Sequence, residues 1–133
     1  MKKNELSLLL ETAKAARLRA HAPYSEFYVG AALQLEDGTI IPGCNVENAS
    51  YGGTVCAERT AFFTAVAAKG KIKPKAMVLV TDPLAVPCGL CLQVMAEFCG
   101  PKFPIYLATP KGIKKRLRFQ QLMPNTFDRR ALE

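Results

Sequence analysis

Three cysteines in two short motifs constrain the fold more than any other feature of the sequence. The first motif is Cys56-Ala57-Glu58 and the second is Pro87-Cys88-Gly89-Leu90-Cys91, and each stands where a helical pattern begins. Side chains at positions i and i+3 of a helix share a face, so Cys88 and Cys91 can converge from one turn. We therefore predict a fold that brings the starts of two helices together.

The three thiols are suited to a metal ion. Thiolate ligands favour zinc over magnesium, calcium or manganese. Three protein ligands leave the fourth tetrahedral position to water, as in a catalytic zinc site, whereas a structural site has four protein ligands. The single histidine, His21, ends the first predicted helix in a basic stretch, where we expect a surface residue. The sequence thus predicts one Zn²⁺ per chain, bound by Cys56, Cys88 and Cys91.

Two charged residues follow the first cysteine closely. A spacing of two residues puts Cys56 and Glu58 on different sides of a regular helix, so the metal has to lie off the helix N-terminus for both to reach it. Glu58 is then placed to act as a general acid and base. Three thiolates and one zinc ion sum to a negative charge. We expect compensation from the two helix N-termini and from Arg59, which can hydrogen-bond a ligating sulfur.

Helices alternate with strands along the chain. A hairpin signal at Asp37-Gly38 and a continuous apolar run over 76–80 indicate an antiparallel pair followed by a strand covered on both faces. Fold class is therefore α/β, a three-layer α/β/α sandwich with a mixed central sheet of about five strands, the later ones parallel. Phe62 and Phe63 are expected in its core. We expect helices over 6–20, 56–68 and 90–98, strands over 27–35, 39–46, 76–80 and 105–108, and a candidate fifth strand over 117–119.

Size and composition narrow the class of protein. A chain of 133 residues is near the commonest domain size, so we predict a single domain over residues 1–133. The apolar stretch Leu6–Leu10 is far shorter than the roughly 20 residues of a membrane span, so no membrane partner is expected. Five cysteines with three in local motifs argue against a disulfide framework and favour a reducing cytoplasm. The net charge of +7 is spread over lysine-rich stretches that are usually solvated, so a nucleic-acid partner is not expected.

The sequence resembles the small homotetrameric, zinc-dependent cytidine deaminases over nearly its whole length. Zinc deaminases carry His or Cys, then any residue and Glu, followed by Pro-Cys-x-x-Cys, and the glutamate is not a ligand. Three further segments carry the resemblance: Tyr24–Ala32, Gly43–Tyr51 and Leu122–Phe127. The resemblance implies a cytidine deaminase-like fold. It also implies the hydrolysis of cytidine and 2′-deoxycytidine to uridine and 2′-deoxyuridine plus ammonia by a zinc-bound hydroxide, in pyrimidine salvage.

The same resemblance implies roles for single residues at the site. Glu58 is expected to be the catalytic acid and base. Asn45 and Glu47 are expected to hydrogen-bond the ribose hydroxyls of a nucleoside substrate. Phe27 would line the base pocket, and Ala57 would offer its backbone to the pyrimidine edge.

The resemblance also implies a homotetramer with shared active sites. Phe127 would stack on the substrate of a neighbouring subunit, with Tyr51 at the same junction. One departure concerns Leu92, which stands where the family usually has an arginine directly after the last zinc cysteine. The loss of that positive charge leaves Arg59 more of the thiolate charge to neutralise.

Other functions fit parts of the pattern. Cys88 and Cys91 alone are compatible with a redox pair, but a third cysteine beside Glu58 argues against it. A deaminase of single-stranded nucleic acid would need room at both ends of the sugar, and a deaminase of another cytosine compound would have no use for the ribose pair. A zinc protein without activity would not need Glu58. The sequence leaves open the preference between cytidine and deoxycytidine, the effect of Leu92, and the role of the +7 charge.

Overall fold

A five-stranded mixed sheet forms the centre of the computed structural model, which describes all residues from Met1 to Glu133. Across the sheet the order is β2-β1-β3-β4-β5. β3 and β4 are parallel, and the other neighbours are antiparallel. The predicted mixed sheet is thus confirmed. The strands are β1 (Gly30–Leu35), β2 (Ile40–Cys44), β3 (Pro74–Val80), β4 (Pro104–Thr109) and β5 (Gly112–Arg118).

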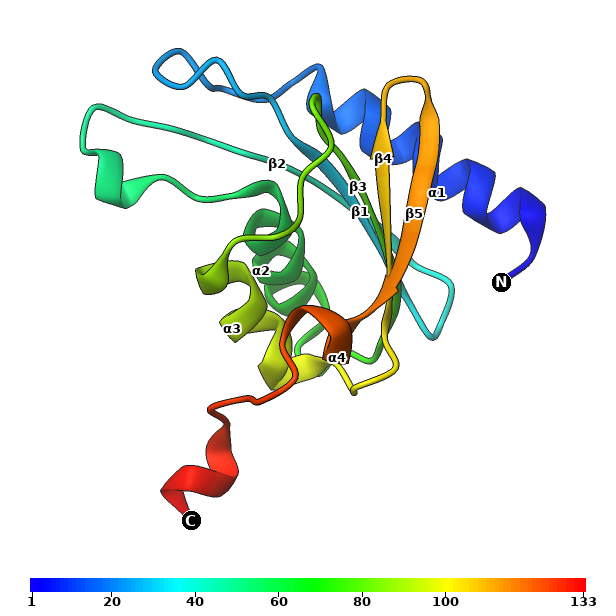
Figure 1. Cartoon of the computed structure of the whole chain (residues 1–133), viewed down its shortest axis with the longest axis vertical. Helices are drawn as coiled ribbons and strands as arrows, with labels where there is room; N and C mark the ends of the chain where they lie inside the picture. The colour runs from blue at the N-terminus through cyan, green and yellow to red at the C-terminus, as the bar shows by residue number, and fades with distance from the viewer.

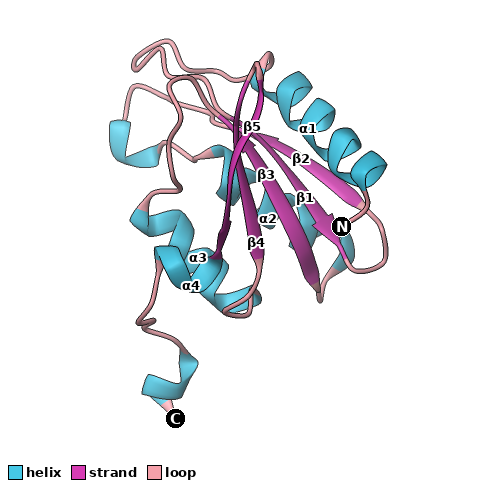
Figure 2. Cartoon of the chain, turned by 45° about the vertical axis from the view of Figure 1, so that its right-hand side comes forward, coloured by secondary structure: helices cyan, strands magenta, loops and turns pink.

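Helices cover both faces of the sheet, as the predicted three-layer sandwich requires. α1 (Lys3–Arg17) lies on one face, and α2 (Ala57–Lys69) and α3 (Gly89–Phe98) lie on the other (Figures 1 and 2). Successive strand residues point to opposite faces. In β3, Met77 and Leu79 accordingly join the core under α2 and α3, whereas Val78 and Val80 join the core under α1.

Two glycines let helices approach the sheet without side chains between them. A Cβ atom at Gly43 of β2 would lie 2.4 Å from the Ala57 carbonyl oxygen and 2.7 Å from the Ala61 nitrogen, both in α2. A Cβ atom at Gly30 of β1 would lie 2.0 Å from the Ala13 carbonyl oxygen in α1. The backbones of helix and strand are therefore in direct contact at both places.

The first hairpin is shorter than the sequence predicts. β1 begins at Gly30 rather than residue 27, because the Asn45 side chain occupies backbone groups of Phe27 and Val29 that a neighbouring strand would otherwise bond. β2 ends at Cys44, and Val46 forms only isolated bridges. Both changes lie at the end of the sheet where the polar residues of the site are found.

Two further expectations are corrected. The fifth strand spans Gly112–Arg118 and runs antiparallel to β4, because the chain reverses at Gly112, whose φ of 134° is open to glycine. Most side chains of this edge strand are charged and exposed, so its sequence lacks the apolar pattern that predicts a strand. Phe62 is fully buried, but the neighbouring Phe63 is 48% exposed, since successive helix residues point in different directions.

None of the helices combines the length and apolar character needed to cross a membrane.

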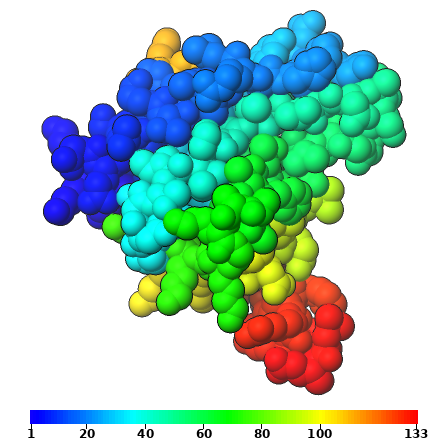
Figure 3. Space-filling model, turned by 180° about the vertical axis from the view of Figure 1, so that it is seen from behind, coloured from blue at the N-terminus to red at the C-terminus, as the bar shows by residue number.

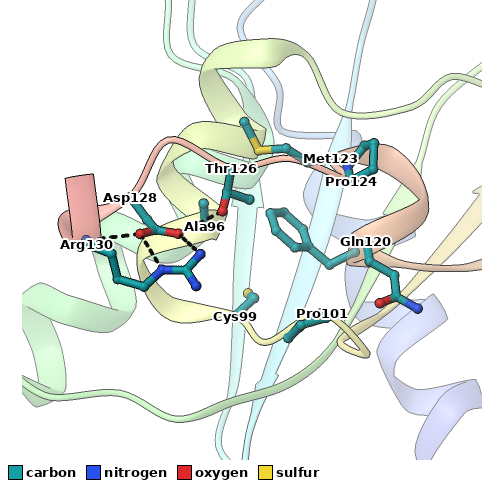
Figure 4. Close-up of a pocket in the computed structure, with 10 residues that line it drawn as sticks. Ala96, Cys99, Pro101, Gln120, Met123, Pro124, Thr126, Asp128 and Arg130 are labelled. Carbon is teal, nitrogen blue, oxygen red and sulfur yellow. Dashed lines mark hydrogen bonds and ion pairs between the residues drawn. The ribbon is translucent and has the colours of Figure 1, made fainter.

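The C-terminal tail projects from the body of the molecule beyond the short helix α4 (Phe119–Leu122) (Figures 1 and 3). The Asp128 carboxylate stabilises the conformation of the tail by accepting hydrogen bonds from the Thr126 hydroxyl and from the Arg130 backbone and guanidinium groups. A cavity of about 360 Å³ lies between the tail, α4 and the end of α3 (Figure 4). Cys99 lines it and is not one of the three motif cysteines.

Candidate active site

The three motif cysteines meet at the N-termini of two helices, as predicted, and we call them the thiol cluster. Cys56 and Cys88 are the N-cap residues of α2 and α3, both with extended backbone, and Cys91 lies in the first turn of α3. The Sγ atoms of Cys56 and Cys88 are 3.8 Å apart, and those of Cys88 and Cys91 are 3.6 Å apart. All three lie within 4.8 Å of one another.

This spacing fits a zinc ion. Zn–S bonds of about 2.3 Å in tetrahedral geometry hold two sulfurs roughly 3.8 Å apart. The helix N-termini place partial positive charge beside the thiolates that a metal requires. The thiol cluster is therefore suited to one Zn²⁺, with the fourth tetrahedral position left to a non-protein ligand.

The thiols do not ionise equally. The hydrogen bond with Cys91, assisted by the Arg59 guanidinium, lowers the pKa of Cys56 to about 5. The same contact with Cys56, together with burial, raises the pKa of Cys91. Cys56 thus carries a thiolate at neutral pH, which is the state of a metal ligand.

Glu58 lies in the first turn of α2 and is only 4% exposed. Burial raises the pKa of its carboxyl to about 7, and the neighbouring Cys56 charge acts in the same direction. Since Cys56 precedes the helix with extended backbone, the two residues do not follow helical spacing. A carboxyl whose pKa lies near 7 can both take up and release a proton under physiological conditions.

Arg59 is the cation that contacts the thiol cluster. Its Nη2 atom lies 3.4 Å from Cys56 Sγ and donates to it, and this contact raises the pKa of the guanidinium. The Arg59 Nε atom is buried and has no hydrogen-bond partner. Leu92 is half-buried and packs against the core beneath α2 and α3, so its side chain contributes apolar contact instead of charge.

A second group of polar residues lies next to the thiol cluster. Asn45 and Glu47, here called the polar pair, are 6% and 8% exposed. Val46, between them, exchanges two backbone hydrogen bonds with Val55, of 2.9 and 3.0 Å. Val55 immediately precedes Cys56. These bonds link the backbone of the polar pair directly to that of the first thiol.

The polar pair also holds the segment over residues 24–29. The Glu47 carboxylate accepts from the backbone N–H groups of Tyr24 and Ser25, at 3.0 and 3.1 Å, and from the Ser25 hydroxyl. These bonds, led by the one from the Ser25 hydroxyl, lower the pKa of Glu47. Asn45 accepts from the Val29 N–H at 2.9 Å and donates to the Phe27 carbonyl at 2.7 Å. The Glu47 carboxylate and the Asn45 amide are therefore both hydrogen-bonded to the protein itself, and neither needs a ligand to hold its position.

A cavity of about 360 Å³ opens beside Glu47. Tyr24 and Tyr51 stand on its wall with ring centroids 5.4 Å apart. Ser25 and Thr54 complete the lining. The walls thus combine aromatic rings with a buried carboxylate, which is the character of a site for a small polar molecule.

The remaining predicted residues are distributed around this region. Ala57 is fully buried in the first turn of α2, where backbone N–H groups have no partner within the helix. Phe27 is half-buried and packs against the core. Phe127 is 61% exposed on the projecting tail, so the fold of one chain does not pack it into its own site. The roles given to these residues stay predictions.

Two residues escape the sequence analysis as parts of the site. Ser25 lies in the segment Tyr24–Ala32 with no role of its own predicted, and its bond to Glu47 spans 22 positions. Gln93, two residues after Cys91 on α3, donates to the Phe127 carbonyl at 2.7 Å. Neither contact has a local sequence signal.

Comparisons with known proteins agree with this geometry. Residues 3–107 match the family model described as the cytidine and deoxycytidylate deaminase zinc-binding region. The chain is 46% identical over 129 residues to a cytidine deaminase of Sporosarcina psychrophila, covering 96% of this chain and 95% of the relative. It is 44% identical over 122 residues to a cytidine deaminase of Halalkalibacterium halodurans, covering 90% and 92% of the two chains.

A solved structure agrees as well. The crystal structure of cytidine deaminase from Burkholderia pseudomallei has 44% sequence identity and a TM-score of 0.85, covering 96% of this chain and 100% of that chain. The match therefore extends over nearly the whole fold.

Proposed function

Because this chain belongs to the cytidine and deoxycytidylate deaminase family, we propose that it is a zinc-dependent cytidine deaminase. It hydrolyses cytidine and 2′-deoxycytidine to uridine and 2′-deoxyuridine and releases ammonia, a reaction of pyrimidine salvage. The observation that carries this proposal is the buried Glu58 carboxyl beside three sulfurs at zinc-binding distances.

Cys56, Cys88 and Cys91 would hold the metal, which would supply activation of the water that displaces the amino group of the base. Glu58 takes one proton from that water and passes it to the ring nitrogen, and it then carries the second proton from the attacking oxygen to the amino group, which leaves as ammonia. Its pKa of about 7 supports both transfers, because neither protonation state is strongly favoured. Arg59 keeps the Cys56 sulfur ionised through its 3.4 Å contact.

The polar pair binds the sugar in this proposal. An ionised carboxylate has about four acceptor positions, and the Glu47 contacts with segment 24–29 use three of them. The Asn45 amide has one N–H left after its bond to Phe27. One free acceptor and one free donor suit a hydroxyl group. Their burial favours a free nucleoside over a polynucleotide, whose sugar has to stay open at both ends.

The base and the rest of the pocket follow from the same assignment. Phe27 lines the side of the base, and the free N–H of Ala57 donates to the pyrimidine edge.

The single deaminase domain spans residues 1–133. The enzyme works in the cytoplasm, where a reducing environment keeps the three thiols available to the metal.

Neighbouring subunits complete each site in a homotetramer. This part of the proposal is supported by large apolar side chains that one chain leaves exposed near the helix N-termini, on α2 and on the tail: Tyr51, Phe63, Val86, Leu90 and Phe127. Gln93 orients the tail by binding the Phe127 carbonyl. Phe127 then stacks on the substrate of a neighbour, and Tyr51 lies at the same junction.

The test combines activity, metal content and mass. Purified protein is mixed with cytidine, the fall in ultraviolet absorbance is followed as uridine forms, and zinc is measured on the same sample. We expect turnover that a chelator abolishes, one zinc per chain, and the mass of four chains by light scattering. Zinc binding without turnover of cytidine or deoxycytidine would contradict the proposed substrate, and turnover by a monomer would contradict the shared site.

A further inference from the structure

A relay of hydrogen bonds joins the two substrate-facing parts of the candidate site. The Phe27 backbone N–H donates to the Ser25 hydroxyl oxygen at 3.1 Å, and the Ser25 hydroxyl donates to Glu47 Oε2. The Phe27 carbonyl accepts from Asn45 at 2.7 Å. Both sides of the Phe27 peptide are therefore fixed by bonds that end on the polar pair.

The backbone between Ser25 and Phe27 needs this support. Glu26 has a φ of 57°, in the left-handed region that non-glycine residues seldom adopt. Its N–H donates to the Ala22 carbonyl at 2.9 Å, which closes the turn on one side only. On the other side, the Ser25 hydroxyl is the group that bridges the strained residue. A non-glycine residue in this conformation persists where surrounding bonds hold it, and such positions cluster at functional sites.

Glu47 Oε2 is also the oxygen with an acceptor position left. Oε1 accepts from both the Tyr24 and Ser25 N–H groups, whereas Oε2 accepts only from the Ser25 hydroxyl. A ligand hydroxyl that donates to Glu47 therefore shares Oε2 with Ser25. The serine hydroxyl is the one protein group that bonds Oε2, so it sets the direction of that oxygen.

We propose that Ser25 is a positioning residue that couples the sugar-binding carboxylate of Glu47 to the base-side wall at Phe27, and so sets the affinity for nucleosides that carry the hydroxyl bound by Glu47. This inference rests on the proposed function. No other side chain bonds both the carboxylate of Glu47 and the backbone of Phe27. Removal of the hydroxyl leaves the Phe27 N–H without its acceptor and leaves Oε2 without a protein donor, while Oε1 keeps its two backbone bonds.

The kinetic experiment compares Ser25→Ala, Ser25→Thr and the wild-type protein on cytidine and on 2′,3′-dideoxycytidine, which lacks both ring hydroxyls. For Ser25→Ala we expect KM for cytidine to rise about tenfold with kcat and zinc content nearly unchanged, the size expected for a lost hydrogen bond to a charged group. On dideoxycytidine the same substitution should change kcat/KM less than threefold. Ser25→Thr keeps the hydroxyl and should restore the cytidine KM to within about threefold.

Equal losses on both substrates would overturn the proposal, because a serine that only supports the fold affects every substrate alike. An unchanged KM in Ser25→Ala would overturn it as well. Ser7→Ala, at an exposed serine of α1, controls for the loss of a hydroxyl elsewhere.

A second measurement tests the coupling without turnover. Amide hydrogen exchange over residues 24–29 should become about tenfold faster in Ser25→Ala and stay near wild type in Ser25→Thr, since the Phe27 N–H loses its acceptor only in the first variant. Unchanged exchange would overturn the relay, whatever the kinetics. If the wild-type protein fails to deaminate cytidine while exchange responds as expected, the proposed function fails and the coupling of Ser25, Glu47 and Phe27 stands.

Discussion

The thiol cluster and the polar pair lie side by side, but the chain builds them in different ways. The cluster is formed where two helices begin, so its geometry follows from caps and first turns that the motifs contain. The polar pair is fixed by five hydrogen bonds to segment 24–29, across 16 to 23 positions of the sequence. Local motifs therefore determine the thiol cluster, and long-range bonds determine the polar pair.

This difference separates chemistry from recognition. Cys56 and Glu58 stand on the rigid start of α2, where groups that act on a reacting atom need to be. Most of the hydrogen-bonding positions of Glu47 and Asn45 are occupied by partners within the protein, and few remain for a ligand. Substitutions in the two regions should consequently affect different measured quantities.

The largest effect is expected from Cys88→Ala, which removes one sulfur of the cluster. Two thiols cannot hold a catalytic zinc, so zinc content and deamination should both fall below detection, a loss on the order of 10³-fold or more. Metal analysis and the absorbance assay on one sample check this. Cys99→Ala is the matched control, because Cys99 lies outside the cluster and should keep its zinc. Full activity in Cys88→Ala would remove the metal centre from the mechanism.

Glu58→Gln should separate the metal from the chemistry. The amide has nearly the shape of the carboxyl but cannot carry the proton, so we expect kcat to fall on the order of 10²- to 10⁴-fold with one zinc still bound per chain. Steady-state kinetics with metal analysis provide the measurement. A variant that keeps its kcat would show that another group transfers the proton.

Glu47→Gln should act on recognition. The substitution replaces one acceptor oxygen by an N–H₂ group, so either the backbone donors of segment 24–29 or the ligand hydroxyl loses its partner. We expect KM for cytidine to rise roughly 10- to 100-fold with zinc content unchanged. Loss of zinc in this variant would mean that the two regions are not independent, and would break the comparison.

Arg59→Ala tests the charge balance of the thiol cluster. Without the contact to Cys56 Sγ, the thiolate loses its cationic partner, and zinc affinity should fall about 10-fold or more, as for other groups that support metal ligands. Competition with a chromogenic chelator measures the affinity. At saturating zinc the KM for cytidine should stay within about twofold of wild type. An unchanged zinc affinity would show that the helix N-termini suffice where Leu92 has replaced the usual arginine.

The smallest effect is expected away from both regions, at Asp37. Lys69 Nζ lies 2.5 Å from its carboxylate, and this bond lowers the pKa of Asp37 below its ordinary value. A folded-state pKa below the unfolded one stabilises the fold above the unfolded value, near pH 4, and the effect is lost as the pH falls through the folded value.

Asp37→Asn should therefore lower Tm by about one or two degrees at pH 7 and by less at pH 2, where part of the stabilisation is already lost. Thermal unfolding at the two pH values, with Glu97→Gln as a control at an exposed glutamate outside the ion pairs, checks this. A shift that is equal at both pH values would show that the carboxylate charge has no part in the effect.

The same contrast explains which parts of the fold and site could be predicted from the sequence. Cys56, Cys88, Cys91 and Glu58 could be assigned because i,i+3 spacing and helix starts are written into adjacent residues, and the apolar run of β3 indicates a covered sheet. The early start of the predicted strand at residue 27 was wrong because Asn45 captures that backbone through its side chain. Ser25 and Gln93 could not be found, since each bonds a residue distant along the chain.

The contact at Gly43 has a mechanical consequence. β2 carries Gly43 two residues before Asn45, and α2 carries Ala57 directly after Cys56, and here the two backbones touch without side chains between them. Closely packed backbones leave no flexible side chain to absorb a relative shift, so this contact holds the strand before the polar pair against the start of α2. A side chain at position 43 would push β2 away from α2, and so would move the polar pair relative to the thiol cluster without altering any functional group chemically.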